Sequence, residues 1–255
     1  MGETGRTRPA FLDHPGPLAI AHRGGAGDWP ENTMPAFAAA VELGYRHVET
    51  DVHVTADGVV VAFHDERLDR VTDRSGLIRE LPYADVRRAR VGGTEVVPRL
   101  DEVLLSWPEL FVNIDPKHDS VVEPLAEVLQ RSGSVERVCI GAFSDRRIAR
   151  LRAMLGPSLC TGMGPAAIAR LRAAGYGLPY RPTEDCAQVP THQGPIPIVD
   201  ERFVRRAHQL GVAVHVWTID DAVEMERLLD LGVDGIMTDR PRVLKDVLVA
   251  RGQWP

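Results

Sequence analysis

Short strand-like runs alternate with helical patterns along most of this chain. Strand-like runs are predicted at residues 18–21, 46–55, 59–63, 110–114, 137–143, 159–164, 187–189, 212–218 and 235–238. Helices are predicted between them at residues 36–43, 98–107, 121–131, 145–155, 166–174, 200–210 and 222–231. This alternation is typical of βαβ units and a parallel sheet. With roughly eight such strands, an α/β fold closed into a (β/α)8 TIM barrel is favoured over an open doubly wound sheet.

Two segments depart from the alternation. Residues 1–16 are polar and rich in Gly and Pro, so we expect a loose N-terminal tail before a single barrel domain at residues 17–255. Residues 67–97 are charged and weakly periodic, which predicts an extended lid-like loop after the third strand.

The link at residues 57–58 is too short for the crossover helix that parallel strands need. Either a hairpin forms there, or residues 52–58 run back along the barrel wall.

Composition narrows the functional classes. The chain has 44% apolar and 26% charged residues, which is ordinary for a soluble globular protein. Its net charge of −6, without a basic stripe, argues against a nucleic-acid partner. No apolar run is long enough for a signal peptide or an integral membrane segment. The three cysteines are an odd, scattered set that favours free thiols in a reducing compartment, so we expect a cytoplasmic location.

One strand-like run carries two carboxylates on the same face. Glu49 and Asp51 are two residues apart, so in a strand their side chains point to one side. They repel each other unless a positive charge lies between them, and Ca2+ and Mg2+ take oxygen ligands. His53 shares this face. The next run ends at His64, whose imidazole is suited to proton transfer near neutral pH.

In a barrel, working side chains gather at the C-terminal ends of the strands. Eight reactive residues fall at or near such ends: His22, Arg23, Glu49, Asp51, His64, Asp115, Lys117 and Trp217. The carboxylates Glu49, Asp51 and Asp115 can hold one divalent cation, Mg2+ or Ca2+. Arg23 and Lys117 can bind phosphate oxygens, and the two histidines can take one proton and deliver another. Cleavage of a phosphodiester requires this set of groups.

The chain resembles the glycerophosphodiester phosphodiesterase family in six motifs that occur in the family's order. They lie at residues 22–25 (His-Arg-Gly-Gly), 30–33 (Pro-Glu-Asn-Thr), 46–65, 113–117 (Asn-Ile-Asp-Pro-Lys), 216–218 (Val-Trp-Thr) and 232–239 (Gly-Val-Asp-Gly-Ile-Met-Thr-Asp). The resemblance implies metal-dependent hydrolysis of a small-molecule glycerophosphodiester to glycerol 3-phosphate and an alcohol. It also implies that His22 and His64 form the acid–base pair and that Trp217 lines the glycerol side of the substrate.

The same resemblance assigns Glu31 and Asn32 to a supporting hydrogen-bond network, although Glu31 could instead stabilise a helix N-terminus. We expect Asp239 to close the barrel rather than take part in chemistry. Two positions depart from the family pattern. Asp115 stands where glutamate is usual, and Gly141 with Ala142 replaces a serine pair before Phe143. The sequence leaves open which histidine is the acid, whether a cyclic phosphate forms first, and the oligomeric state.

Two other functions compete with this one. A lysophospholipase D acting on lysophospholipids at a membrane surface would need an exposed apolar stretch near the rim, and Leu77 with Ile78 is the only candidate. A catalytically silent barrel that binds phosphorylated metabolites would be favoured by the loss of a histidine or a carboxylate, and none is lost.

Overall fold

A nearly closed parallel barrel forms the centre of the computed structural model, which describes residues 8–254. Within that range eight strands form the barrel: β1 (Leu18–Ala21), β2 (His47–Val54), β6 (Phe111–Pro116), β7 (Val138–Ile140), β8 (Cys160–Thr161), β9 (Cys186–Val189), β12 (Ala213–Val216) and β13 (Gly235–Thr238). Their order is β8-β7-β6-β2-β1-β13-β12-β9. One parallel bridge, between Gly162 and Cys186, joins the two end strands. The predicted α/β TIM barrel is therefore confirmed.

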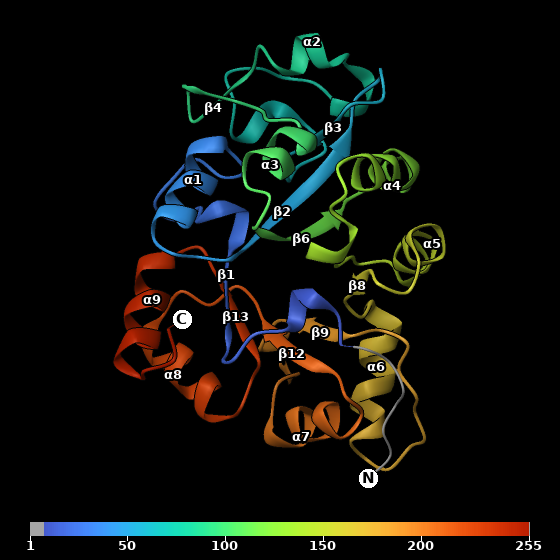
Figure 1. Cartoon of the computed structure of the whole chain (residues 1–255), viewed down its shortest axis with the longest axis vertical. Helices are drawn as coiled ribbons and strands as arrows, with labels where there is room; N and C mark the ends of the chain where they lie inside the picture. Colours follow the sequence, from blue (N-terminus) through green and yellow to red (C-terminus); the bar gives the residue numbers. More distant parts are fainter. Residues whose placement is uncertain (1–7, 255) are drawn as a thin grey trace.

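Helices surround the strands (Figure 1). They are α1 (Met34–Glu42), α3 (Leu100–Ser106), α4 (Val122–Arg131), α5 (Asp145–Leu155), α6 (Pro165–Ala174), α7 (Glu201–Gln209), α8 (Ala222–Asp230) and α9 (Pro241–Ala250). Polar side chains cap several N-termini, as when Thr33 Oγ1 accepts a hydrogen bond from the Ala36 amide at α1. The sequence predicted all of these helices except α9, which begins with Pro241 and buries Leu244 and Leu248.

The main apolar core lies between the outer face of the barrel and the helices. All eight residues of β2 are buried, because a parallel strand in a barrel is covered on both faces. Val48 and Val52 of β2 belong to the main apolar core. Glu49 and Asp51 alternate with them and therefore point into the barrel. One strand thus supplies both packing and polar groups.

The chain between β2 and α3 forms a hairpin and a small packed unit. β3 (Val60–Ala62) pairs antiparallel with β2, with Val54 opposite Val60 and Val52 opposite Ala62. The hairpin alternative is thus the one that occurs, and β3 is not a barrel strand. After it come η3 (Leu68–Arg70), η4 (Ile78–Glu80), α2 (Tyr83–Val86), β4 (Arg90–Val91) and β5 (Glu95–Val96).

This packed unit has an apolar cluster of its own, consisting of Val61, Phe63, Leu68, Ile78, Val86, Ala89, Val91 and Val97. The sequence predicts a lid-like loop at residues 67–97, whereas the structure has short elements packed around this cluster. Ile78 is fully buried. Leu77 with Ile78 is therefore not the exposed apolar stretch considered above.

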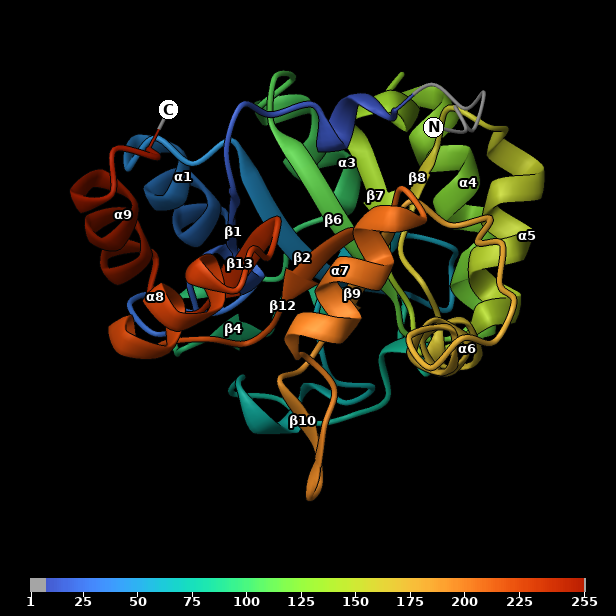
Figure 2. The same cartoon turned by 90° about the horizontal axis from the view of Figure 1, so that it is seen from below.

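The N-terminal segment covers the end of the barrel where the strands begin (Figure 2). Residues 1–7 of the predicted tail lie outside the described residues. Ala10–Leu12 forms η1, in which Phe11 is fully buried, with its ring edge-on to His47 at 5.0 Å and to Phe111 at 6.0 Å. The prediction of a loose tail is wrong for η1, because its two apolar side chains plug the barrel.

Further short elements connect the strands. They are η2 (His22–Gly24), η5 (Asp119–Val121), η6 (Val135–Arg137), and a hairpin of β10 (His192–Gln193) and β11 (Ile196–Pro197) that projects from the molecule (Figure 2). The sequence did not predict this hairpin. Across residues 8–254, no helix combines the length and apolar character needed to cross a membrane.

Candidate active site

The three carboxylates that the sequence assigns to the rim lie on two adjacent strands. Glu49 and Asp51 point into the barrel from β2, and their side chains are only 5% and 2% exposed. The parallel register places Asp115 of β6 opposite Asp51. Strand pairing therefore brings together acidic groups that are more than sixty positions apart in the sequence.

Two basic side chains neutralise Asp51. Lys117 Nζ lies 2.7 Å from Asp51 Oδ1 and 2.7 Å from Asp115 Oδ2, so it bridges the two strands. Arg23 Nε lies 3.1 Å from Asp51 Oδ2. Burial opposes ionisation of Asp51, but Lys117 and Arg23 outweigh it and lower the pKa of this carboxyl. Asp51 is therefore an anion in this arrangement.

The other two carboxylates are less well compensated. Burial, reinforced by the Asp51 charge, raises the pKa of Glu49 to about 7. Burial also raises the pKa of Asp115, whose Oδ1 is buried without a hydrogen-bond partner. Glu49 accepts the backbone N–H of Arg23 at 3.1 Å. The hard oxygen donors of these carboxylates and their incompletely compensated negative charge suit a divalent cation.

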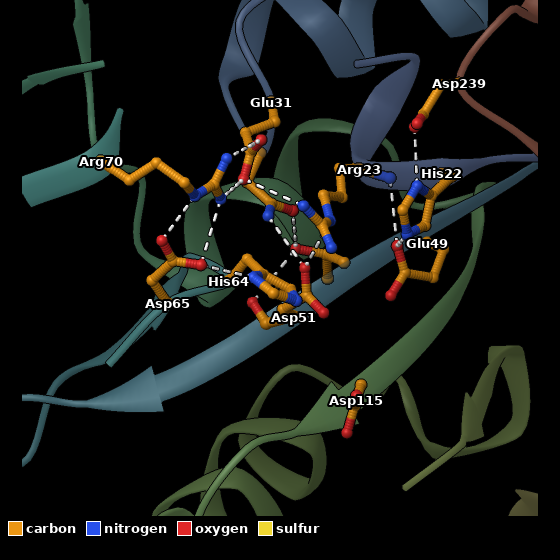
Figure 3. A network of polar contacts seen from close by, with 12 residues as sticks. His22, Arg23, Glu31, Glu49, Asp51, His64, Asp65, Arg70, Asp115 and Asp239 are labelled. Carbon is orange, nitrogen blue, oxygen red and sulfur yellow. Dashed lines mark hydrogen bonds and ion pairs between the residues drawn. The ribbon is translucent and has the colours of Figure 1, made fainter. Parts of the chain in front are cut away.

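His22 follows β1 and lies between two carboxylates (Figure 3). Its Nδ1 is 2.7 Å from Asp239 Oδ1, and its Nε2 is 3.8 Å from Glu49 Oε2. Burial alone would lower the pKa of His22, but Glu49 and Asp239 together raise it above its usual value. The sequence predicts only a barrel-closing role for Asp239. The structure corrects this, because the end of β13 lies beside β1 and brings Asp239 to His22.

The sequence places His64 at the end of a barrel strand. In the structure, His64 instead reaches the site from the β2–β3 hairpin. β3 runs back along β2, and the Phe63 amide donates to the Asp51 carbonyl at 2.9 Å. His64 Nδ1 is 2.5 Å from Asp65 Oδ1. The buried His53, which shares a strand face with Glu49 and Asp51, has its Nε2 3.0 Å from the His64 carbonyl. His53 therefore holds the backbone that carries His64.

Glu31 and Asn32 lie in a polar network that links the loop before α1 to β2, η2 and η3. Glu31 forms ion pairs with Arg23 at 3.2 Å and with Arg70 at 2.6 Å. Arg70 also pairs with Asp65 at 2.6 Å, so it joins Glu31 to the partner of His64 (Figure 3). Glu31 thus contacts side chains of the site rather than only preceding a helix. The sequence does not predict Arg70, because its spacing carries no signal.

Asn32 supports Asp51 from an unusual backbone conformation. Its Nδ2 donates to Asp51 Oδ2 at 3.2 Å, and its Oδ1 accepts from Thr50 Oγ1 at 2.7 Å. Both Asn32 and Arg23 have positive φ, 56° and 51°. Asparagine tolerates this left-handed region well, whereas arginine rarely adopts it. The turn at Arg23 is the one that presents its backbone N–H to Glu49.

An aromatic pair follows two further strands of the barrel. Trp217 follows β12, and Phe143 follows β7. Their rings meet edge to face with centroids 5.8 Å apart. Phe143 is 68% exposed, which is high for a phenylalanine. The sequence predicts Trp217 at the site, whereas Phe143 stands out there only as the residue after Gly141 and Ala142.

Residues 22–243 match a family model described as the glycerophosphoryl diester phosphodiesterase family. The chain belongs to this family. It is accordingly a phosphoric diester hydrolase, and the resemblance read from the six motifs is confirmed. The matched residues include every candidate site residue named above.

Relatives align with nine-tenths or more of the chain. A Mycobacterium tuberculosis protein named "Probable glycerophosphodiester phosphodiesterase 2" is 40% identical over 100% of this chain and 99% of its own length. A lysophospholipase D of Rattus norvegicus is 30% identical over 90% of this chain and 85% of its own length. A crystal structure from Silicibacter pomeroyi DSS-3 superimposes with a TM-score of 0.81, at 25% identity, over 96% of this chain and 98% of that one.

Proposed function

We propose that this family member hydrolyses glycerophosphodiesters to glycerol 3-phosphate and an alcohol, using one divalent cation and the acid–base pair His22 and His64. The observation that carries the proposal is the set of two aspartate-bound histidines near the buried Glu49 and Asp51 and the partly buried Asp115 at the C-terminal rim. A silent barrel that only binds phosphorylated metabolites would need neither histidine held in this way.

The proposed cation would be held by Glu49, Asp51 and Asp115. Its donors are oxygen atoms without sulfur or imidazole, which favours Mg2+ or Ca2+ over Zn2+. The fit is supported by Asp115 Oδ1, a buried acceptor with no hydrogen-bond partner. When bound, the cation would neutralise charge on the phosphate oxygens.

Each histidine would move a proton through Nε2. The Nδ1 atoms of His22 and His64 are bonded to Asp239 and Asp65, which leaves Nε2 of each ring for the reacting groups. One imidazole takes the proton of the attacking oxygen nucleophile, and the other donates a proton to the oxygen of the departing alcohol. The aspartates keep each ring in one orientation and one tautomer.

Substrate binding would use the basic and the aromatic sides of the rim. Arg23 and Lys117 supply positive charge for the phosphate oxygens. Trp217 and Phe143 present apolar ring surface on the other side, suited to the carbon backbone of glycerol.

The test is release of glycerol 3-phosphate from glycerophosphocholine. Chelation should abolish turnover, and Mg2+ or Ca2+ should restore it. His22→Ala and His64→Ala should each lose roughly 10²–10⁴-fold in rate. A nitrophenyl substrate should partly rescue the variant that lacks the general acid, which identifies it. Full turnover after exhaustive chelation, with no metal in the protein, would end the proposal of metal dependence.

A lysophospholipase D activity is the second candidate. It is supported by the Rattus norvegicus relative and by the exposed Phe143 beside Trp217. Choline release from lysophosphatidylcholine and from glycerophosphocholine should be compared in the wild type and in Phe143→Ala. A preference for the lysophospholipid that disappears in Phe143→Ala would favour this candidate over the first.

We also propose a cytoplasmic location. All three cysteines of the chain are free and buried, which favours a reducing compartment.

A further inference from the structure

Three cysteines that lie far apart in the sequence converge inside the barrel. Cys139 is on β7, Cys160 on β8 and Cys186 on β9, and all three are fully buried. Their Sγ atoms lie within 4.8 Å of one another, and Cys139 Sγ is 3.8 Å from Cys186 Sγ. A single buried thiol packs as a small apolar group and needs no explanation. Three sulfur atoms meeting at one point form a possible ligand set.

A buried imidazole lies next to this cluster. His215, on the neighbouring strand β12, is fully buried, and its Nε2 has no hydrogen-bond partner. In the parallel register Ala213 is opposite Cys186, so His215 is diagonal to Cys186 on the same inner face. Hydrogen bonds from Cys139 and Cys160, and then His215, lower the pKa of the Cys186 thiol. His215 therefore contacts Cys186 from the neighbouring strand, whereas the group of ligand atoms that all lie within 4.8 Å of one another consists of the three sulfur atoms.

We propose that Cys139, Cys160 and Cys186 form a site for one soft metal ion of the Zn2+ class, and that His215 completes a four-coordinate ligand set by rotation of its side chain. Zinc binds cysteine sulfur at ~2.3 Å, so two sulfur ligands at the corners of a tetrahedron lie ~3.8 Å apart, the separation that Cys139 and Cys186 already have. Three sulfur ligands and one imidazole are a common structural zinc set. Burial raises the pKa of the Cys139 and Cys160 thiols, and ligation to a cation would deprotonate them.

The position of the cluster indicates a structural role. β8 has only two residues, and one isolated bridge joins it to β9, which is the least extensive junction around the barrel. The three sulfur atoms come from the strands on both sides of that junction. A metal ion bound to them would cross-link β7, β8 and β9 where strand pairing is shortest. Disulfides would not do this, since three thiols allow one disulfide and leave one thiol over.

This site differs in chemistry from the carboxylate cluster. Its sulfur and nitrogen donors suit soft metals, whereas Glu49, Asp51 and Asp115 offer hard oxygen atoms. Co2+ separates the two, because only thiolate ligands give cobalt an intense charge-transfer absorption in the near ultraviolet.

The experiment uses the full chain, reduced, unfolded and refolded with Co2+ or Zn2+. We expect the thiolate–cobalt absorption to saturate at one metal ion per chain and to persist in excess Mg2+. Bound Zn2+ should protect all three thiols from alkylation. It should also raise Tm by roughly 8–16 °C when free Zn2+ exceeds Kd about a thousand-fold.

Two variants assign the absorption to its ligands. Cys160→Ser should lose most of it, whereas Glu49→Gln, which alters the carboxylate cluster, should retain it. If Cys160→Ser does not fold, the wild-type titration decides alone. A refolded wild type without thiolate–cobalt absorption, or with three thiols that react equally fast with and without Zn2+, would overturn the proposal. A Cys139–Cys186 disulfide formed under the purification conditions would also overturn it.

Discussion

At the scale of single residues, each of the two site histidines has an aspartate bound to its Nδ1 atom. His22 and His64 each bind an aspartate through Nδ1, at 2.7 Å and 2.5 Å, although the two aspartates come from different parts of the chain. Asp239 is 217 positions from His22, whereas Asp65 is the next residue after His64. A carboxylate at Nδ1 fixes the tautomer of an imidazole and stabilises its protonated form. Both aspartates should therefore affect the rate without contacting the substrate.

Replacing Asp239 tests this positioning role. In Asp239→Asn we expect kcat to fall roughly 10²–10⁴-fold, because an amide neither holds the reactive tautomer nor stabilises the imidazolium. The pH profile of kcat should shift as well, which a purely structural defect would not cause. Asp234→Asn is the matched control, since Asp234 Oδ2 pairs with His208 at 2.8 Å just before β13, at the opposite end of that strand. A wild-type rate in Asp239→Asn would exclude the role.

Substitutions at Asp115 test how the third carboxylate contributes to metal binding. Aspartate is shorter than the glutamate usual here by one C–C bond, roughly 1.5 Å, so we expect it to act on the metal through a water molecule. Asp115→Ala should then raise the Mg2+ or Ca2+ concentration for half-maximal activity roughly 10–100-fold. Asp115→Glu should keep activity, and Asp115→Asn should lie between them. An unchanged metal titration in Asp115→Ala would remove this residue from the site.

At the scale of elements, the β2–β3 hairpin supports part of the site on a separate apolar cluster. The cluster of the packed unit after β3 is distinct from the main core, and His64 directly follows Phe63, a member of that cluster. Arg70, in η3 of that unit, pairs with Asp65 and Glu31. The position of His64 therefore depends on a part of the fold that can open independently of the barrel.

Ile78→Ala tests whether the packed unit after β3 opens independently of the barrel. Ile78 is fully buried in the cluster of the packed unit, and its truncation should cost about 2–5 kcal/mol. Hydrogen exchange should quicken at residues 68–97 while β1 and β13 stay protected, and kcat should fall as His64 loses its support. Leu129→Ala, at a fully buried position of the main core, is the control and should quicken exchange in the barrel. Equal loss of protection across the molecule in Ile78→Ala would contradict this account.

At the scale of the whole molecule, the ends of the chain complete the barrel. η1 plugs one end through Phe11, and α9 packs beside β1 and β13. Tyr45, just before β2, donates its hydroxyl to the Pro241 carbonyl at 2.7 Å and meets the Trp254 ring edge to face at 5.2 Å. Burial, with a smaller contribution from the Asp246 charge, raises the pKa of Tyr45 well above its usual value. This one phenol therefore couples the C-terminal helix to pH.

The sign of that coupling is definite. The unfolded Tyr45 loses its proton at pH ~10, whereas the folded phenol keeps it at that pH, so stability falls as pH rises above ~10. In Tyr45→Phe the alkaline decline in the free energy of unfolding should be shallower by up to ~1.4 kcal/mol per pH unit. At neutral pH the variant should be less stable by about 0.5–1.5 kcal/mol, since the hydrogen bond is lost. Urea unfolding between pH 8 and 12 measures both, and parallel curves for the two proteins would refute the prediction.

The sequence by itself determined most of the barrel strands and helices and most of the candidate residues at the rim. Local pattern decides whether a segment forms a strand or a capped helix, and the two-residue period of a strand is enough to place Glu49 and Asp51 on one face. The same local pattern identifies the other carboxylate, the histidines and the basic residues, because each follows a predicted strand or hairpin. The aspartate at position 115, where glutamate is usual, is equally visible in the sequence.

Only the tertiary structure decided which of these groups meet. The direction of β3, the partnership of His22 with Asp239 and the ion pairs of Arg70 depend on strand register and on barrel closure. The convergence of Cys139, Cys160 and Cys186 depends on the same two features, since their spacing of 21 and 26 positions matches no local period. Contacts of this range arise when a sheet curves and its end strands join, and no short window of sequence encodes that geometry.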